Sequence, residues 1–202
     1  MSIAAGNGII LALLAAGQSR RFGDQDKLTA LLHGKMLGLH AAGTLASLPF
    51  DRRIIIASCP DHPCTDGWKE MGYDVVANDH ASEGQSTSVR CATASAITCN
   101  AEAICICLAD MPYITCEHIE RLVRAFQECG RDSVIASSDD GKAMPPALFP
   151  SSQFAILQDV QGDQGARKLL KTAHLVPVDD GSLLDIDTPE ILAMENRKIP
   201  GL

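Results

Sequence analysis

Short, uninterrupted apolar runs alternate with helical patterns along the whole chain, and this alternation limits the fold more than any other feature. The two clearest runs are residues 9–14 (Ile-Ile-Leu-Ala-Leu-Leu) and residues 103–109 (Ala-Ile-Cys-Ile-Cys-Leu-Ala). Such runs are typical of parallel strands that are buried on both faces. The alternation therefore predicts an α/β protein in three layers, with a mainly parallel central sheet and helices on both faces. Ligands of such folds bind at the carboxyl ends of strands, so we expect a site in the loops after Leu14 and Ala109.

The remaining elements follow from the same patterns. Further strands are expected at residues 54–57, 74–76, 133–137, 147–149 and 174–178, and helices at 37–48, 66–71, 86–98, 115–129, 151–157, 165–172 and 189–196. The helix at 115–129 has clear end signals, because Thr115 can cap its start and Gly130 can end it. With 202 residues and no repeats or linkers, we expect a flexible segment 1–8 and a single domain 9–202.

Composition excludes several classes of protein. Apolar residues make up 46% and charged residues 21%, the mix of a soluble globular protein. The formal net charge of −8 argues against a large nucleic-acid-binding surface, which needs a basic stripe. No apolar run reaches the roughly 18 residues that cross a bilayer, and no basic segment precedes Ile9. We therefore expect a cytoplasmic protein that binds neither membrane nor nucleic acid.

The eight cysteines are expected to be reduced. Cys105 and Cys107 lie inside an apolar run, where a thiol behaves as a small hydrophobic group. Cys59, His62 and Cys64 could form part of a zinc site, but structural zinc usually takes four ligands and a fourth is missing.

The loop after the first predicted strand carries the features of an anion site. Gly17 and Gly23 permit unusual backbone angles and the close approach of a ligand to main-chain N–H groups. Arg20, Arg21 and Lys27 add positive charge, and such cations together with backbone donors are what a triphosphate requires. The loop is neither a Walker A loop nor a Gly-x-Gly-x-x-Gly dinucleotide loop. A surface loop with solvated charges remains the alternative.

Two carboxylates are candidate metal ligands. Asp110 directly follows the run 103–109, and Asp187 shares a face with Asp185 if that segment is extended. Magnesium prefers one or two carboxylates together with phosphate oxygens and water. The alternatives are local: Asp110 could stabilise its own turn, and Asp187 could cap a helix that begins near Pro189.

Five segments together resemble a known family. They are Leu14-Ala15-Ala16-Gly17-x-Ser19-x-Arg21-Phe22-Gly23 with Lys27, Glu83-Gly84-Gln85-Ser86-x-Ser88-Val89-Arg90, Leu108-Ala109-Asp110-Met111-Pro112, Gly162-Asp163-x-Gly165-Ala166-Arg167 and Asp185-Ile186-Asp187-Thr188-Pro189-Glu190. The first resembles the signature loop of nucleotidyltransferases with a Rossmann-like, GT-A-like fold. The set is most similar to the MobA-like NTP transferases, and within them to the MocA-like molybdenum cofactor cytidylyltransferases. One departure is Met144, which stands where the family commonly has glycine.

The resemblance implies a role for each matching residue. Nucleotide binding falls to Leu14, Ala15, Ala16, Gly17, Ser19, Arg20, Arg21, Gly23, Lys27, Gly84, Ser88 and Asp110, and acceptor binding to Gly162, Asp163, Gly165, Ala166 and Arg167. Asp110 and Asp187 would bind Mg²⁺, and Lys27, Arg21 and Asp110 are the expected catalytic residues. The implied reaction transfers a nucleotidyl group to the phosphate of molybdopterin cofactor and releases pyrophosphate, with a molybdoenzyme as the recipient of the product.

The nucleotide base and the acceptor leave alternatives open. Guanylyl-transferring relatives typically carry Ala-Gly-Gly where this chain has Ala15-Ala16-Gly17, which favours CTP over GTP. The rivals are transfer from GTP or to another phosphorylated acceptor such as a sugar phosphate, and a GT-A glycosyltransferase that uses Asp185-x-Asp187. A non-catalytic, nucleotide-binding maturation factor for a molybdoenzyme is the last alternative.

Overall fold

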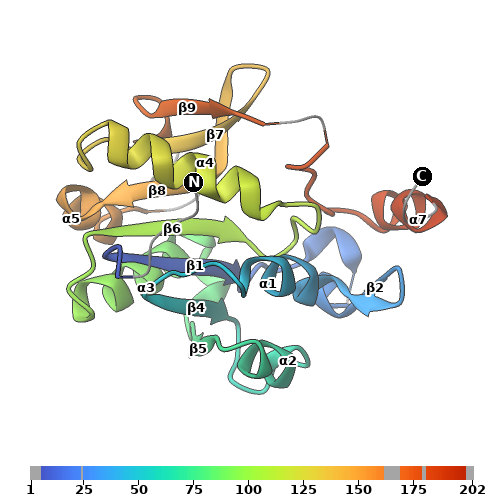
Figure 1. The fold of residues 1–202 in the computed structure, drawn as a ribbon. Coiled ribbons are helices and arrows are strands. Elements are labelled where there is room, and N and C mark those ends of the chain that lie inside the picture. The colour runs from blue at the N-terminus through green and yellow to red at the C-terminus, as the bar shows by residue number, and fades with distance from the viewer. Residues whose placement is uncertain (1–5, 24, 162–168, 179–180, 199–202) are drawn as a thin grey trace.

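A seven-stranded sheet forms the centre of the computed structural model, which describes residues 6–23, 25–161, 169–178 and 181–198. The strand order is β5-β4-β1-β6-β8-β7-β9 (Figure 1). These strands are β1 (Ile9–Ala15), β4 (Arg52–Ala57), β5 (Asp74–Ala77), β6 (Ala103–Leu108), β7 (Ile135–Asp139), β8 (Lys142–Pro150) and β9 (His174–Pro177). A small hairpin of β2 (Leu31–Leu32) and β3 (Lys35–Met36) stands apart from the sheet.

The sheet is mainly parallel, as the apolar runs predict. β5, β4, β1 and β6 pair in parallel, and β7 pairs in parallel with β9. β8 is antiparallel to both of its neighbours, β6 and β7. The alternating fold class of the sequence is therefore confirmed, with one reversed strand inserted between two parallel groups.

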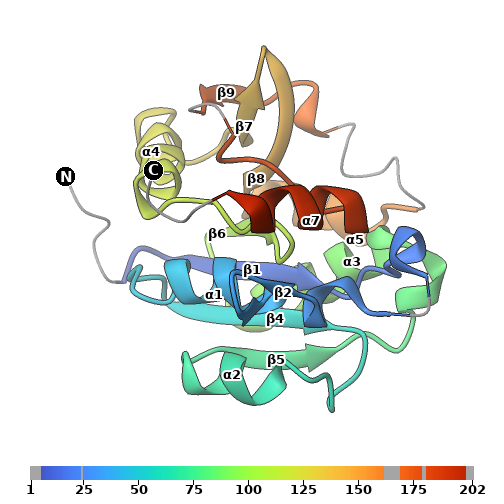
Figure 2. The same cartoon turned by 90° about the vertical axis from the view of Figure 1, so that its right-hand side faces the viewer.

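The helices lie on both faces of the sheet (Figures 1 and 2). They are α1 (His40–Leu45), α2 (Thr65–Glu70), α3 (Gln85–Thr98), α4 (Cys116–Glu128), α5 (Phe154–Gln158) and α7 (Pro189–Arg197). Side chains alternate along β1, so that Leu11 packs into one apolar cluster with α1, α2 and α4, and Ala12 into another with α3 and α5. Short 3₁₀ turns η1 (Arg20–Phe22), η2 (Lys27–Thr29), η3 (Leu37–Leu39), η4 (Ala81–Glu83) and η5 (Ser151–Gln153) complete the described elements.

β8 is longer than the expected strand at 147–149. Its pairing with β7 shifts register between Ala136 and Ser137, so that Ala136 faces Ala147 while Ser137 faces Met144. Pro145 and Pro146 lie at this irregularity, between the two paired stretches. Proline has no N–H to donate to a neighbouring strand, so it is tolerated at a position that is not paired. Because prolines are unusual inside strands, the sequence pattern does not predict the first half of β8.

The structure also bears on the N-terminal segment and on membrane-spanning helices. Of the segment 1–8, the structure describes residues 6–8, in which Asn7 is buried and its N–H donates to the Asp51 carboxylate. None of the described helices is both long enough and apolar enough to cross a membrane.

A Thr115→Ala variant is expected to lower the free energy of unfolding by about 1 kcal/mol. The Thr115 side chain caps α4 by accepting a hydrogen bond from the His118 N–H at 3.1 Å, and alanine leaves that donor without the partner. Urea unfolding followed by circular dichroism measures the change, with Thr115→Ser as the control that keeps the hydroxyl. Equal stability of the alanine and serine variants would contradict the capping role.

Candidate active site

A cavity of about 940 Å³ opens at the carboxyl ends of β1 and β6, where the sequence places the ligand site. Its lining comes from the end of β1 and the loop after it, the start of α3, the end of β6 with the turn after it, the strand β8, residues 170–175, and the segment before α7. The lining includes Leu14, Ala15, Ala16, Gly17, Gln18, Lys27, Gly84, Gln85, Ser88, Asp110, Lys142, Ala143, Met144, Pro145, Lys171, Asp185 and Asp187. Most of the predicted nucleotide-binding residues that the structure describes thus face one cavity.

The loop after β1 leaves its backbone open to a ligand. Gly23 has a φ of +69°, and Ser19 also has a left-handed backbone with φ +47°. Gly17 has no such angle, but a Cβ built on it would meet no other protein atom within 4 Å. Both glycines therefore leave open space beside the main chain, and Gly23 in addition adopts the backbone angle that favours glycine.

Lys27 joins the two predicted metal-binding carboxylates. Its Nζ donates to Asp110 Oδ2 and, at 2.7 Å, to Asp187 Oδ1. Arg21 donates to the other oxygen of Asp187 at 3.0 Å. The Lys27 and Asp110 side chains are only 11% and 13% exposed, so their charges interact in a partly desolvated setting.

These contacts show whether Asp110 and Asp187 stabilise their own turn or helix start, or instead belong to the cavity. Thr188, not Asp187, caps α7, because its side chain accepts from the Ile191 N–H. The Asp110 carboxylate contacts Lys27, 83 residues away, instead of a group in its own turn. Both local alternatives are wrong, and both carboxylates belong to the cavity.

The charges shift one another's protonation. Burial alone would raise the pKa of Asp187, but Lys27 and Arg21 outweigh it and hold the pKa below its ordinary value. Burial opposes the charged form of Lys27, but Asp110 and Asp187 raise its pKa above the ordinary value. Burial and then the neighbouring carboxylates of Asp187 and Asp110 raise the pKa of Asp185. The site thus concentrates negative charge that a cation can stabilise.

The donor set fits a hard divalent cation. Asp110 Oδ1 is buried and has no hydrogen-bond partner, which is costly unless a cation or another donor reaches it. Among the described residues, no group of three or more His, Cys, Asp or Glu side chains is placed to hold a metal ion. Two carboxylates suffice for Mg²⁺ when substrate phosphates and water supply the other ligands. His62 and Cys64, two of the residues considered for zinc, instead form hydrogen bonds within the protein, to Asp26 and to the Leu28 carbonyl respectively.

The start of α3 forms the second side of the cavity. Gly84 has a φ of +112° and directly precedes α3. Ser88 is buried, and its hydroxyl accepts from the Asn78 side chain at 3.0 Å. Asn78 also donates to Thr87 at 2.8 Å and is itself 1% exposed. Asn78 is a supporting residue that the sequence analysis missed, although its place directly after β5 could have marked it.

Two groups of predicted site residues fall outside this description. Gly162, Asp163, Gly165, Ala166 and Arg167, the expected acceptor-binding residues, lie outside the described residues. Arg20 begins η1, and its side chain is likewise outside the description. The cavity lining also includes Lys142 and Lys171, neither of which the sequence analysis singled out.

The fold and the site together are those of a nucleotidyltransferase with a Rossmann-like fold: a mainly parallel α/β sheet, a basic loop after its first strand, and two carboxylates that meet at Lys27, Asp110 after the neighbouring strand β6 and Asp187 before α7. Residues 11–178 match the family described as "MobA-like NTP transferase domain". The chain belongs to this family, as the motifs of the sequence indicate.

Known proteins support this membership. The chain is 34% identical to "Purine catabolism protein PucB" of Bacillus subtilis, over 94% of this chain and 96% of that protein. It is 25% identical to a "Probable molybdenum cofactor guanylyltransferase" of Pyrococcus horikoshii, over 84% and 83% of the two chains. A nucleotidyl transferase from Methanothermobacter has a similar fold, with a TM-score of 0.73 and 17% identity over 95% of this chain and 97% of that chain.

Proposed function

We propose that the protein transfers a nucleotidyl group, CMP from CTP, to the phosphate of molybdopterin cofactor and releases pyrophosphate. The observation that carries the proposal is the contact of Lys27 with Asp110 and Asp187 in the lining of a cavity to which the glycine-containing loop also contributes. The cavity volume of about 940 Å³ lies at the upper end of the range for small-molecule sites, and a reaction with two substrates needs such space.

The proposed reaction is a substitution at the α-phosphorus of the triphosphate. An oxygen of the acceptor phosphate forms the new P–O bond, and the bond to the β-phosphate oxygen breaks as pyrophosphate leaves. A phosphate monoester is already largely ionised at neutral pH, so the acceptor needs no strong general base. Catalysis then rests on positioning and on the neutralisation of charge.

Different residues of the cavity would position the substrates and neutralise their charge. Backbone N–H groups of residues 16–19 bind the triphosphate, while Lys27 and Arg21 neutralise the β- and γ-phosphates and the leaving pyrophosphate. The flexible stem of Lys27 lets its ammonium reach a phosphate beside the carboxylates that it now contacts. Asp110 and Asp187 would hold Mg²⁺, which would supply Lewis acidity and a template for the phosphates.

The proposed nucleotide and the proposed acceptor are inferred from different residues. Ala16 lines the cavity at the position where guanylyl-transferring relatives typically have glycine, and its methyl group is the reason for proposing CTP. The segment 162–167 is the reason for proposing molybdopterin, by its resemblance to the acceptor motif of that branch. Because the 34% identical relative is named for purine catabolism, a molybdoenzyme that oxidises a purine is the first recipient to test.

Pyrophosphate release with molybdopterin cofactor and each of the four NTPs tests the proposal. We expect release with CTP to exceed release with GTP by about tenfold or more, the size of discrimination that one small group in a pocket provides. A preference for GTP would overturn the base assignment alone. Release with a sugar phosphate but not with molybdopterin would overturn the acceptor, and no release with any acceptor would overturn the enzyme proposal.

A further inference from the structure

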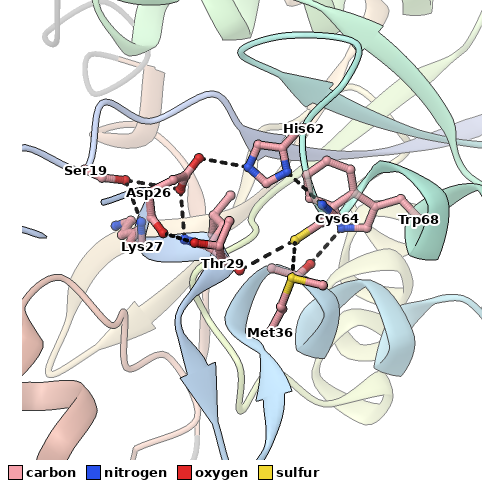
Figure 3. A network of polar contacts seen from close by, with 10 residues as sticks. Ser19, Asp26, Lys27, Thr29, Met36, His62, Cys64 and Trp68 are labelled. Atoms are coloured by element: carbon pink, nitrogen blue, oxygen red, sulfur yellow. Dashed lines mark hydrogen bonds and ion pairs between the residues drawn. The ribbon is translucent and has the colours of Figure 1, made fainter. Parts of the chain in front are cut away.

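His62 lies outside the cavity lining, yet it contacts the loop that carries Lys27 (Figure 3). It stands between β4 and α2, and its side chain is 2% exposed. Its Nε2 lies 2.8 Å from Asp26 Oδ2, across 36 residues of sequence. A buried histidine joined to the residue before Lys27 connects a separate part of the chain with the triphosphate loop.

The contacts of His62 fix the direction of this hydrogen bond. The Cys64 backbone N–H lies 3.1 Å from His62 Nδ1 and can only donate, so Nδ1 accepts. The ring proton of the neutral imidazole is then on Nε2, where it is donated to Asp26. The ring also stacks on Trp68, with centroids 4.9 Å apart and planes 18° from parallel, and Trp68 is anchored by its own bond to the Gly38 carbonyl. The donor therefore has one orientation.

Asp26 passes this constraint to both ends of the loop. Its Oδ1 accepts from the Leu28 N–H at 2.9 Å and from the Ser19 hydroxyl at 3.4 Å. Ser19 Oγ in turn accepts from the Lys27 N–H at 3.1 Å. Burial acts to raise the pKa of Asp26, but the hydrogen bonds from His62 and Leu28 outweigh it and lower the pKa. The carboxylate thus stays ionised and clamps Ser19 to the start of η2.

We propose that His62 is a positioning residue for the triphosphate: through Asp26 it fixes Ser19 and Lys27 in the geometry that binds the β- and γ-phosphates. This inference rests on the role proposed above for Lys27. It also explains how a loop with a carboxylate next to its lysine can bind a polyanion. Both oxygens of Asp26 are engaged by donors of the protein, so the carboxylate is directed into the loop structure.

The test compares two replacements of His62. His62→Phe keeps an aromatic ring on Trp68 but removes the donor to Asp26, whereas His62→Gln retains an N–H group that can reach Asp26. We expect His62→Phe to raise the Kd and the KM for CTP about tenfold, the effect of one hydrogen bond to a charged group. The KM for the acceptor stays unchanged, and His62→Gln restores CTP binding to within about threefold of the unmodified protein.

A double-mutant cycle shows whether His62 acts through Asp26. If it does, the Kd for CTP of the Asp26→Ala variant does not rise further when His62→Phe is added. Thr115→Ala, which weakens a cap remote from this loop, controls for lost stability and should leave the Kd for CTP unchanged. Additive effects, or a His62→Phe variant that is less stable but binds CTP normally, would overturn the inference.

Calorimetry with CTP and, in parallel, GTP separates this inference from the proposed function. It needs no acceptor, so it gives a result even if the acceptor assignment is wrong. Binding by the unmodified protein together with unchanged binding by His62→Phe would overturn the role of His62 alone. If neither nucleotide binds the unmodified protein, both the proposed function and the inference are overturned.

Discussion

An Asp110→Ala variant is expected to fold normally and to lose nucleotidyl transfer by roughly a thousandfold or more. One oxygen of Asp110 contacts Lys27, and the other is buried without a hydrogen-bond partner. Alanine removes a ligand for a cation and one of the two carboxylates that hold the Lys27 ammonium, and both the cation and the ammonium act on the same reacting phosphates. Pyrophosphate release under saturating CTP measures the loss.

The Asp110→Ala substitution is not expected to disturb the fold. Asp110 follows β6 and does not pack in its core, and the backbone contact between the Ile186 N–H and the Asp110 carbonyl does not need the side chain. A matched control is Asp74→Ala, which removes an exposed carboxylate that pairs with Arg52 at the sheet edge. This control should keep full activity. Normal turnover by Asp110→Ala would show that the metal and phosphate site lies elsewhere.

The parallel strands of the sheet and part of the candidate site can be predicted from the sequence, because the patterns that mark them are local. Buried parallel strands such as β1 and β6 appear as continuous apolar runs, and Asp110 is the first polar residue after one of them. In a parallel sheet the carboxyl ends of neighbouring strands lie together. The proximity of the basic loop to Asp110 thus follows from the pairing of β1 with β6.

What the sequence could not provide are contacts between distant segments. Lys27 and Asp187 are separated by 160 residues, and nothing in either segment alone excludes a solvated lysine or a capping aspartate. Asn78 and His62 act through hydrogen bonds whose partners lie in other segments: Thr87 and Ser88 in α3 for Asn78, and Asp26 before η2 for His62. The reversed strand β8 was predicted too short, because prolines interrupt the pattern of residues that marks a strand.

A Lys27→Met variant is expected to lose at least as much activity as Asp110→Ala, and also to bind CTP roughly a hundredfold more weakly. Methionine keeps most of the apolar stem of lysine but removes the ammonium that neutralises phosphate charge. It also leaves Asp110, Asp185 and Asp187 facing one another without their shared cation. Calorimetry measures the binding, and Lys69→Met, at an exposed position of α2, is the matched control that should bind CTP normally.

The stability of the same variant should depend on pH in a defined way. Asp187 has a pKa below its ordinary 3.8, so its pairing with Lys27 stabilises the fold above that value and is lost as the pH falls further. Lys27 has a pKa above its ordinary 10.5, so the pairing is also present up to that pH and is lost as the pH rises through the raised pKa. The difference in unfolding free energy between the unmodified protein and Lys27→Met should therefore be constant near neutral pH and shrink at both extremes.

Urea unfolding at a series of pH values measures this difference. Metal-free buffer isolates the protein's own charges, since a bound cation would also stabilise the carboxylates. A difference that stays the same from acid to neutral pH would show that Lys27 does not pair with Asp187 in solution. Weak binding of CTP combined with such a flat profile would then mean that Lys27 binds the triphosphate from a position independent of the carboxylates, and the single charged cluster proposed here would have to be divided into two sites.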